Sequence, residues 1–154
     1  MAAPEQPVKD PLVHVCGLLN KHGVHYLIVG GHACILHGLV RTTEDVDLLV
    51  EENEDNYRRI IAALSELQDG AAAELNPKDI ETNVVIKVAD EVIVDVSRRA
   101  WTVSYADAIS SALAVEIDGV RIPYIGLTAL IASKETYREK DIADLSLLRR
   151  LARQ

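Results

Sequence analysis

The chain has 154 residues, of which 49% are hydrophobic, as expected for one globular domain with a sizeable core. It contains no Phe, one Trp and five Tyr, so the core must consist mainly of aliphatic side chains. The aromatic platforms of single-strand nucleic-acid binders are therefore not expected. A net charge of −8 also disfavours general nucleic-acid binding, which depends on basic surfaces.

Residues 1–9 contain two prolines and no hydrophobic periodicity, and we predict a flexible lead-in there, followed by a single domain over residues 10–154. The N-terminus lacks the apolar segment of a signal peptide, and no run approaches the ~18 apolar residues of a membrane span. We therefore expect a cytoplasmic protein with no membrane association. Cys16 and Cys34 are isolated in sequence and are expected to be buried thiols.

The first half of the domain predicts helices and strands in alternation. A helix begins at Asp10-Pro11, a capping pair, and ends near Gly23. A buried strand at residues 25–29, a short helix at 32–37 and a second strand at 45–50 follow. A longer helix begins at Asn53 or Glu54, and its apolar face comprises Tyr57, Ile60, Ile61, Leu64 and Leu67.

The second half predicts hairpins and then helices. Residues 70–82 form a connection of no evident role, in which Asn76-Pro77 can open a short helix. Residues 84–88 and 92–96 are β-branched runs typical of an antiparallel hairpin, and 115–124 predicts another, turned at Asp118-Gly119. From about Thr128 the pattern is helical to the end, in two segments. Strands that both alternate with helices and form hairpins indicate an α+β fold with a mixed sheet.

Asp45 and Asp47 are the first candidates for chemistry. Residues two apart in a strand share one face, with Cα atoms about 6.6 Å apart, so their repulsion is on the order of 2–3 kcal/mol. A divalent cation such as Mg²⁺, which prefers carboxylate oxygens, would offset this cost. Two solvated surface acids are the alternative. Asp95, a lone acid in an apolar strand, adds a third carboxylate if the two strands are neighbours; a solvent-facing position at the sheet edge is its alternative.

Gly30-Gly31 lies between a predicted strand and a predicted helix. Glycines at such a junction let backbone N–H groups approach a phosphate at a helix N-terminus. The pair matches neither the dinucleotide fingerprint G-x-G-x-x-G nor the Walker A loop, so neither of those nucleotide folds is supported.

Three separated elements carry a family resemblance: Val29-Gly30-Gly31, then Arg41-Thr-Thr-Glu-Asp-Val-Asp47, then Val94-Asp95-Val96. Their order and spacing resemble the polymerase-β-type nucleotidyltransferase superfamily. The stretch from Lys134 to Leu145 is similar to the closing segment of bacterial nucleotidyltransferase-like proteins akin to abortive-infection toxins. The resemblance implies a nucleotidyltransferase-like mixed sheet backed by helices, with C-terminal helices flanking the cleft.

The resemblance also implies site residues. Asp45, Asp47 and Asp95 would be catalytic and would bind Mg²⁺ or Mn²⁺, as two ions. The nucleotide-binding residues would be Gly30, Gly31, Arg41, Thr43, Lys134 and Arg138. Alternatives remain from the residues alone: Arg41 and Thr43 suit a loop-stabilising role equally well, and Lys134 and Arg138, four apart on a predicted helix, suit a solvated charged face. His32 and His37 are expected to be structural or to line the pocket.

The implied reaction is transfer of a nucleoside monophosphate from an NTP to an acceptor hydroxyl, with release of pyrophosphate. The acceptor is left open among a tRNA end, a protein hydroxyl and a small molecule. The alternative function is a non-catalytic nucleotide-binding or partner protein, such as one member of a toxin–antitoxin pair.

Overall fold

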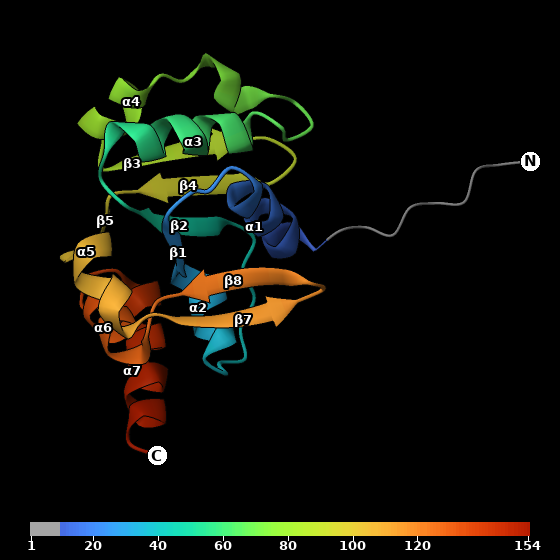
Figure 1. Cartoon of the computed structure of the whole chain (residues 1–154). Helices are drawn as coiled ribbons and strands as arrows, with labels where there is room; N and C mark the ends of the chain where they lie inside the picture. Colours follow the sequence, from blue (N-terminus) through green and yellow to red (C-terminus); the bar gives the residue numbers. More distant parts are fainter. Residues whose placement is uncertain (1–9) are drawn as a thin grey trace, which may run out of the picture.

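A six-stranded mixed sheet with helices on both faces organises the molecule (Figure 1). The computed structural model describes residues 10–154, so the predicted lead-in at residues 1–9 lies outside the described residues. The strand order is β3-β4-β2-β1-β8-β7. β2 is antiparallel to β1 and parallel to β4, while β8 is parallel to β1. The predicted α+β fold with a mixed sheet is confirmed.

The strands of the main sheet are β1 (Tyr26–Val29), β2 (Val46–Val50), β3 (Val85–Ala89), β4 (Ile93–Ser97), β7 (Leu113–Ile117) and β8 (Val120–Tyr124). A separate short hairpin consists of β5 (Arg99–Ala100) and β6 (Val103–Ser104). The helices are α1 (Pro11–Lys21), α2 (Gly30–Leu36), α3 (Glu54–Leu64), α4 (Pro77–Thr82), α5 (Tyr105–Ala108), α6 (Leu127–Ser133) and α7 (Glu139–Ala152), with short 3₁₀ turns η1 (Ala71–Glu74) and η2 (Ile109–Ser111).

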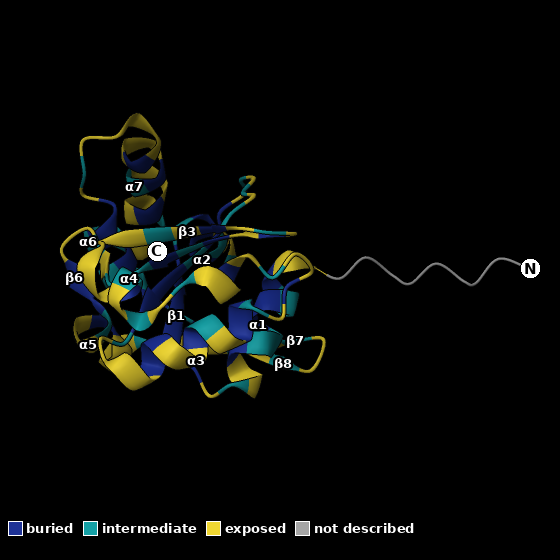
Figure 2. Ribbon diagram, turned by 90° about the horizontal axis from the view of Figure 1, so that it is seen from above, coloured by how far each residue is buried: buried dark blue, intermediate teal, exposed yellow. Residues whose placement is uncertain are grey.

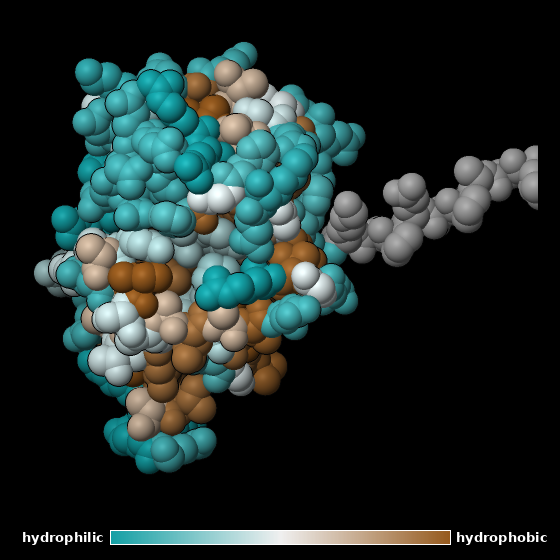
Figure 3. All heavy atoms as spheres, viewed as in Figure 1, coloured by the Kyte–Doolittle hydropathy of each residue, from teal (hydrophilic) through white to brown (hydrophobic). Residues whose placement is uncertain are grey.

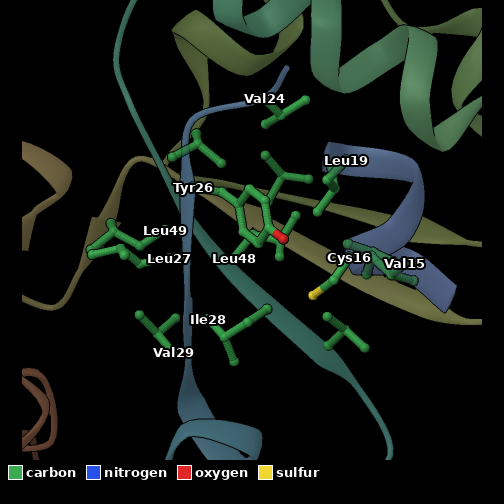
Figure 4. Close-up of a cluster of buried hydrophobic side chains, with 14 of the residues drawn as sticks. Val15, Cys16, Leu19, Val24, Tyr26, Leu27, Ile28, Val29, Leu48 and Leu49 are labelled. Atoms are coloured by element: carbon green, nitrogen blue, oxygen red, sulfur yellow. The ribbon is translucent and has the colours of Figure 1, made fainter. Parts of the chain in front are cut away.

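The core lies on both sides of β1 and β2. α1 and α3 cover one face of the sheet, while α2 and α6 lie on the opposite side (Figures 1 and 2). Figure 4 shows Tyr26 and Leu48 directed toward Val15 and Cys16 of α1, whereas Leu27 and Leu49 point the other way. Because both faces are covered, all four residues of β1 are buried, which explains its uninterrupted apolar sequence. Cys16 is a buried free thiol, as expected, and burial raises its pKa to about 12.

The predicted connection at residues 70–82 folds against the first hairpin. Its 3₁₀ turn is tied down by Asp90, whose carboxylate accepts hydrogen bonds from the backbone N–H groups of Asp69 at 2.8 Å and Ala71 at 2.9 Å. Asn76 caps α4 with Pro77 at the first helical position, as the sequence predicts. The segment therefore covers the end of the β3–β4 hairpin.

The C-terminal region differs from the expectation of helix to the end. α6 ends at Ser133, and α7 begins only at Glu139. The prediction that Lys134 and Arg138 share one helix face is therefore wrong: Lys134 is the C-terminal cap of α6, and Arg138 is the N-terminal cap of α7. Side-chain bonds of the intervening residues to Asp141 explain the break and are described below.

The visible surface divides by polarity. In Figure 3 the upper half is mainly hydrophilic, whereas apolar residues gather lower down, in the region of β7, β8 and the C-terminal helices. Exposed apolar side chains there include Leu113 on β7 and Ile142 and Leu147 on α7. Within residues 10–154, no helix combines the length and the apolar character that crossing a bilayer requires.

Candidate functional site

A row of charged side chains crosses three neighbouring strands. The parallel register of β2 and β4 sets Asp47 directly opposite Asp95, and the antiparallel register of β3 and β4 sets Lys87 opposite Asp95. Directly paired residues project from the same face of a sheet. Asp45 precedes β2 by one residue and lies two positions before Asp47, which puts it on that face as well. The three predicted carboxylates thus lie on the same face of two neighbouring strands.

This row lies in a cleft of about 960 Å³ between the sheet, the β5–β6 hairpin and the α6–α7 connection. Leu48, the residue after Asp47, points toward α1 (Figure 4), so Asp47 and the cleft that it lines are on the opposite face of the sheet. All nine predicted site residues line it: Gly30, Gly31, Arg41, Thr43, Asp45, Asp47, Asp95, Lys134 and Arg138.

Asp47 is the most strongly perturbed carboxyl group of the cleft. Burial raises its pKa from 3.8 to about 7, and the hydrogen bond and negative charge of Asp95, followed by the charge of Asp45, act in the same direction. The ammonium of Lys134 opposes them. The folded protein without a bound cation therefore holds a proton on Asp47 up to near neutral pH, as expected for acids that lack a compensating charge.

Lys87 supplies part of that missing charge. Its Nζ lies 3.4 Å from Asp45 Oδ2, to which it donates a hydrogen bond, and 3.2 Å from Asp95 Oδ1. The second contact is an ion pair without hydrogen-bond geometry. The buried Oδ1 of Asp95 therefore has no hydrogen-bond partner. The two carboxylates, Asp95 above all, raise the pKa of Lys87.

The donor set suits a divalent cation in its chemistry but is not gathered around one point. Among residues 10–154, no group of three or more His, Cys, Asp or Glu side chains is placed to hold a metal ion. The Lys87 ammonium pairs with both Asp45 and Asp95 and so occupies space that a cation would need. Carboxylate oxygens are nevertheless the ligands that Mg²⁺ prefers, and Asp95 Oδ1, which accepts no hydrogen bond, could act as one of them. A cation fits if Lys87 turns away.

The two adjacent glycines make room for side chains of the cleft. Gly30 has φ +66, and a Cβ atom there would lie 2.1 Å from Asp47 Oδ2. A Cβ atom at Gly31 would lie 2.5 Å from Thr43 Oγ1. Glycine is therefore required at both positions, for the left-handed backbone at the first and for close side-chain approach at both. Helix α2 begins at Gly30, two residues earlier than predicted.

Two buried acids of α7, Asp141 and Asp144, hold the basic side chains of Lys134 and Arg41 at one side of the cleft. Lys134 is 7% exposed, and its Nζ lies 3.2 Å from Asp141 Oδ1 and 3.0 Å from Asp144 Oδ2. Asp144 also pairs with Arg41, which precedes β2. Arg41 and Lys134, far apart in the sequence, are thus held by one carboxylate. The structure supports the alternative of a loop-stabilising role for Arg41 and leaves its guanidinium on the cleft surface.

The α6–α7 connection is organised by Asp141. Its Oδ2 accepts hydrogen bonds from Thr136 Oγ1 and Arg138 Nε, both at 2.6 Å. Burial would raise the pKa of Asp141, but these two hydrogen bonds and Lys134 lower it below its usual range. A fully buried carboxylate with three such partners is satisfied, so the connection has a defined shape instead of continuing as helix.

The two histidines after the glycines have different surroundings. His37 Nε2 lies 2.8 Å from the carbonyl oxygen of Ile125, and its ring packs edge-on against Tyr124, as expected for a structural residue. His32 lines a smaller hollow beside Arg41 and Thr43, and burial lowers its pKa.

Several residues of the cleft region were not predicted as site residues, among them Lys87, Trp101, Tyr137, Asp141 and Asp144. The signal for Lys87 was its place in the strand that pairs with the Asp95 strand. The two acids of α7 are three residues apart and so share a helix face, a pattern that an exposed helix also shows.

Comparison with known proteins agrees with this arrangement. Residues 8–154 match the model of a family described as nucleotidyl transferase of unknown function (DUF2204). Among curated proteins no match was found.

Solved structures share the fold. An antigenic nucleotidyltransferase-like protein from Paracoccidioides brasiliensis superposes with a TM-score of 0.57 at 16% identity, over 91% of this chain and 74% of that one. A crystal structure from Thermotoga maritima that is described as a nucleotidyltransferase gives a TM-score of 0.55 at 16% identity, over 91% of this chain and 89% of that one. The fold is thus nucleotidyltransferase-like, and the family match covers nearly the whole sequence. The chain belongs to this family of nucleotidyl transferases of unknown function.

Proposed function

We propose that the protein is a metal-dependent nucleotidyltransferase, which moves a nucleoside monophosphate from an NTP to an acceptor hydroxyl and releases pyrophosphate. The observation that carries the proposal is the direct pairing of Asp47 with Asp95 across β2 and β4, in a cleft that also contains Asp45 and the Gly30-Gly31 turn. Family membership supports nucleotidyl transfer as the reaction class. The acceptor stays open among a tRNA end, a protein hydroxyl and a small molecule.

In this proposal Asp45, Asp47 and Asp95 hold one or two Mg²⁺ or Mn²⁺ ions. Bound Mg²⁺ would supply neutralisation of phosphate charge and stabilise the attacking and leaving oxygens of an in-line displacement. Lys87 would have to leave its position between Asp45 and Asp95 for a cation to be held there. Asp95 would accept the proton of the acceptor hydroxyl at Oδ1, the oxygen that accepts no hydrogen bond in the metal-free protein.

The remaining predicted residues orient the triphosphate. The Gly30-Gly31 turn offers backbone N–H groups with no Cβ atom in the way, and Thr43 lies beside it. Arg138, whose side chain is 64% exposed, can reach a phosphate without leaving a buried charge behind. Lys134 is buried in its ion pairs, so it acts on the cleft through its charge.

The ion pairs of Lys87 favour a second candidate, a non-catalytic nucleotide-binding protein. A lysine that pairs with both Asp45 and Asp95 offsets part of their negative charge without a metal ion. In that case NTP binding would persist without any transfer. Membership of a toxin–antitoxin pair stays a prediction.

The experiment has two readouts. We expect an NTP with Mg²⁺ to stabilise the fold by about 2.7 kcal/mol at about 100 times Kd, and either component alone to do much less. Incubation with the four α-labelled NTPs, Mg²⁺ and a cell lysate then tests transfer. Asp47→Asn should abolish labelling, while Asp69→Asn, an exposed acid outside the cleft, should not. Stabilisation without transfer supports the non-catalytic candidate; no stabilisation by any NTP–metal combination contradicts both.

A further inference from the structure

Two exposed aromatic rings meet at the mouth of the cleft. Trp101 lies in the turn between β5 and β6, and Tyr137 lies in the α6–α7 connection. Their ring centroids are 6.0 Å apart with an interplanar angle of 88°. Both residues line the cleft that contains Asp47 and Asp95. The pair therefore joins two opposite walls of the candidate site.

These rings are not part of the core. Trp101 is 49% exposed and Tyr137 is 90% exposed. Aromatic residues are scarce in this chain, which has one Trp, five Tyr and no Phe. Tyr26 and Tyr57 are buried. Large open rings contribute little to folding, and in a chain with so few of them their meeting at one cleft indicates a binding role.

The backbone at Trp101 adds a second, independent observation. Its φ is +58, a left-handed conformation that is a genuine outlier for a bulky residue. Such backbone strain is unfavourable and concentrates at functional sites. Glycine would relieve it at no cost to the core, because the side chain is half exposed. The strained turn aims the ring at the cleft.

We propose that Trp101 and Tyr137 form the binding surface for the nucleobase of the NTP. The inference rests on the proposed function, because it assigns one end of that substrate. Triphosphate and base are joined by a single ribose, and a cleft of about 960 Å³ accommodates a ligand of that size. The carboxylates and the glycine turn suit the phosphate end, and the open aromatic faces suit the planar end. Stacking accepts every base, so purines bind more tightly than pyrimidines only through their larger ring area.

Trp101 is the only tryptophan of the chain, so its fluorescence reports on this surface directly. We expect Mg²⁺–ATP to quench the emission, and Mg²⁺–tripolyphosphate, which has no base, to bind without a comparable change. Calorimetric titration gives the affinities. Trp101→Leu should raise the Kd for ATP about tenfold, within the range of base stacking, and leave the Kd for tripolyphosphate unchanged. Trp101→Phe should keep most of the affinity. Ile109→Ala, a change of an exposed apolar residue outside the cleft, is the matched control.

Tyr137→Leu is the second variant. A side chain that is 90% exposed is expected to contribute little to folding, and this variant keeps Trp101 as the fluorescent reporter. It should weaken ATP binding several-fold and reduce the quenching. If ATP and tripolyphosphate bind equally well and both variants bind ATP as the native protein does, the proposal is overturned while the proposed function stands. If neither ligand binds in the presence of Mg²⁺, both fail together.

Discussion

Replacing Asp47 by Asn tests the electrostatics of the cleft apart from its activity. In the protein without a cation, the charged form of Asp47 is disfavoured by burial and by the neighbouring carboxylates Asp95 and Asp45. Asparagine has nearly the same shape and no charge, and its amide N–H can donate to Asp95. We therefore expect Asp47→Asn to stabilise the metal-free fold while it abolishes metal-dependent transfer.

The magnitude follows from the pKa. A rise from 3.8 to about 7 means that the folded state binds this proton more tightly than the unfolded state. Stability then falls as the pH rises from about 4 to about 7, and it levels off above that range. At about 1.4 kcal/mol per pKa unit, the full loss is on the order of 4 kcal/mol. Relaxation of the side chains and the attraction of Lys134 reduce it, so we expect a gain of roughly 1–3 kcal/mol for the variant at about pH 8 and almost none at about pH 4.

Urea unfolding in the presence of a chelator measures this difference. The native protein, Asp47→Asn and the control Asp69→Asn are compared at about pH 4 and about pH 8. The control should show the same small difference at both pH values, because its carboxylate is exposed. If Asp47→Asn is destabilising to the same extent at both pH values, the carboxylate is a structural partner and the reasoning is refuted.

Three further substitutions test other parts of the site. Gly30→Ala should destabilise the fold by about 2–3 kcal/mol in urea unfolding, because φ is positive there and the new Cβ would collide with the carboxylate of Asp47. The control Gly38→Ala also has a positive φ, +106, but open space around it, so it should cost clearly less. Asp144→Asn should cost about 2–3 kcal/mol in the same assay, because it removes the charge that pairs with both the buried Lys134 and Arg41. A change below about 0.5 kcal/mol would contradict this. Lys87→Met should lower the Mg²⁺ concentration needed to raise the melting temperature, whereas coincident titrations of variant and native protein would show that the lysine does not compete with the metal.

The sheet was the most predictable part of the molecule. Apolar runs bounded by glycines or turn residues predicted β1, β2 and both hairpins, because buried strands need such runs wherever they lie in the chain. A common site for the three aspartates was predicted on the condition that their strands are neighbours, and the pairing of β2 with β4 meets that condition. The short β5–β6 hairpin could not be predicted, since its two-residue strands have no hydrophobic periodicity.

Register explains why Lys87 escaped prediction. A hairpin centred on Asp90 would set Val85 opposite Asp95, but the observed pairing is centred on Glu91 and brings Lys87 there. The shift goes together with long-range contacts of the turn, in which Asp90 and Glu91 accept backbone hydrogen bonds from residues 68–71. Likewise, the break between α6 and α7 depends on Asp141, which follows the break, so local helix periodicity does not reveal it.

The parallel pairing of β2 with β4 has a consequence for how the protein folds. The two strands are far apart in the chain, so their pairing closes a long loop before Asp47 can lie opposite Asp95. Closing such a loop costs entropy early and is repaid only when the strands dock, which makes long-range parallel pairs slow to form. A slip of one strand by one residue would turn its acid to the opposite face and separate Asp47 from Asp95. We expect nucleotide affinity to return in the slowest structural phase of refolding, after most secondary structure has formed, so that a partly folded chain does not sequester nucleotide.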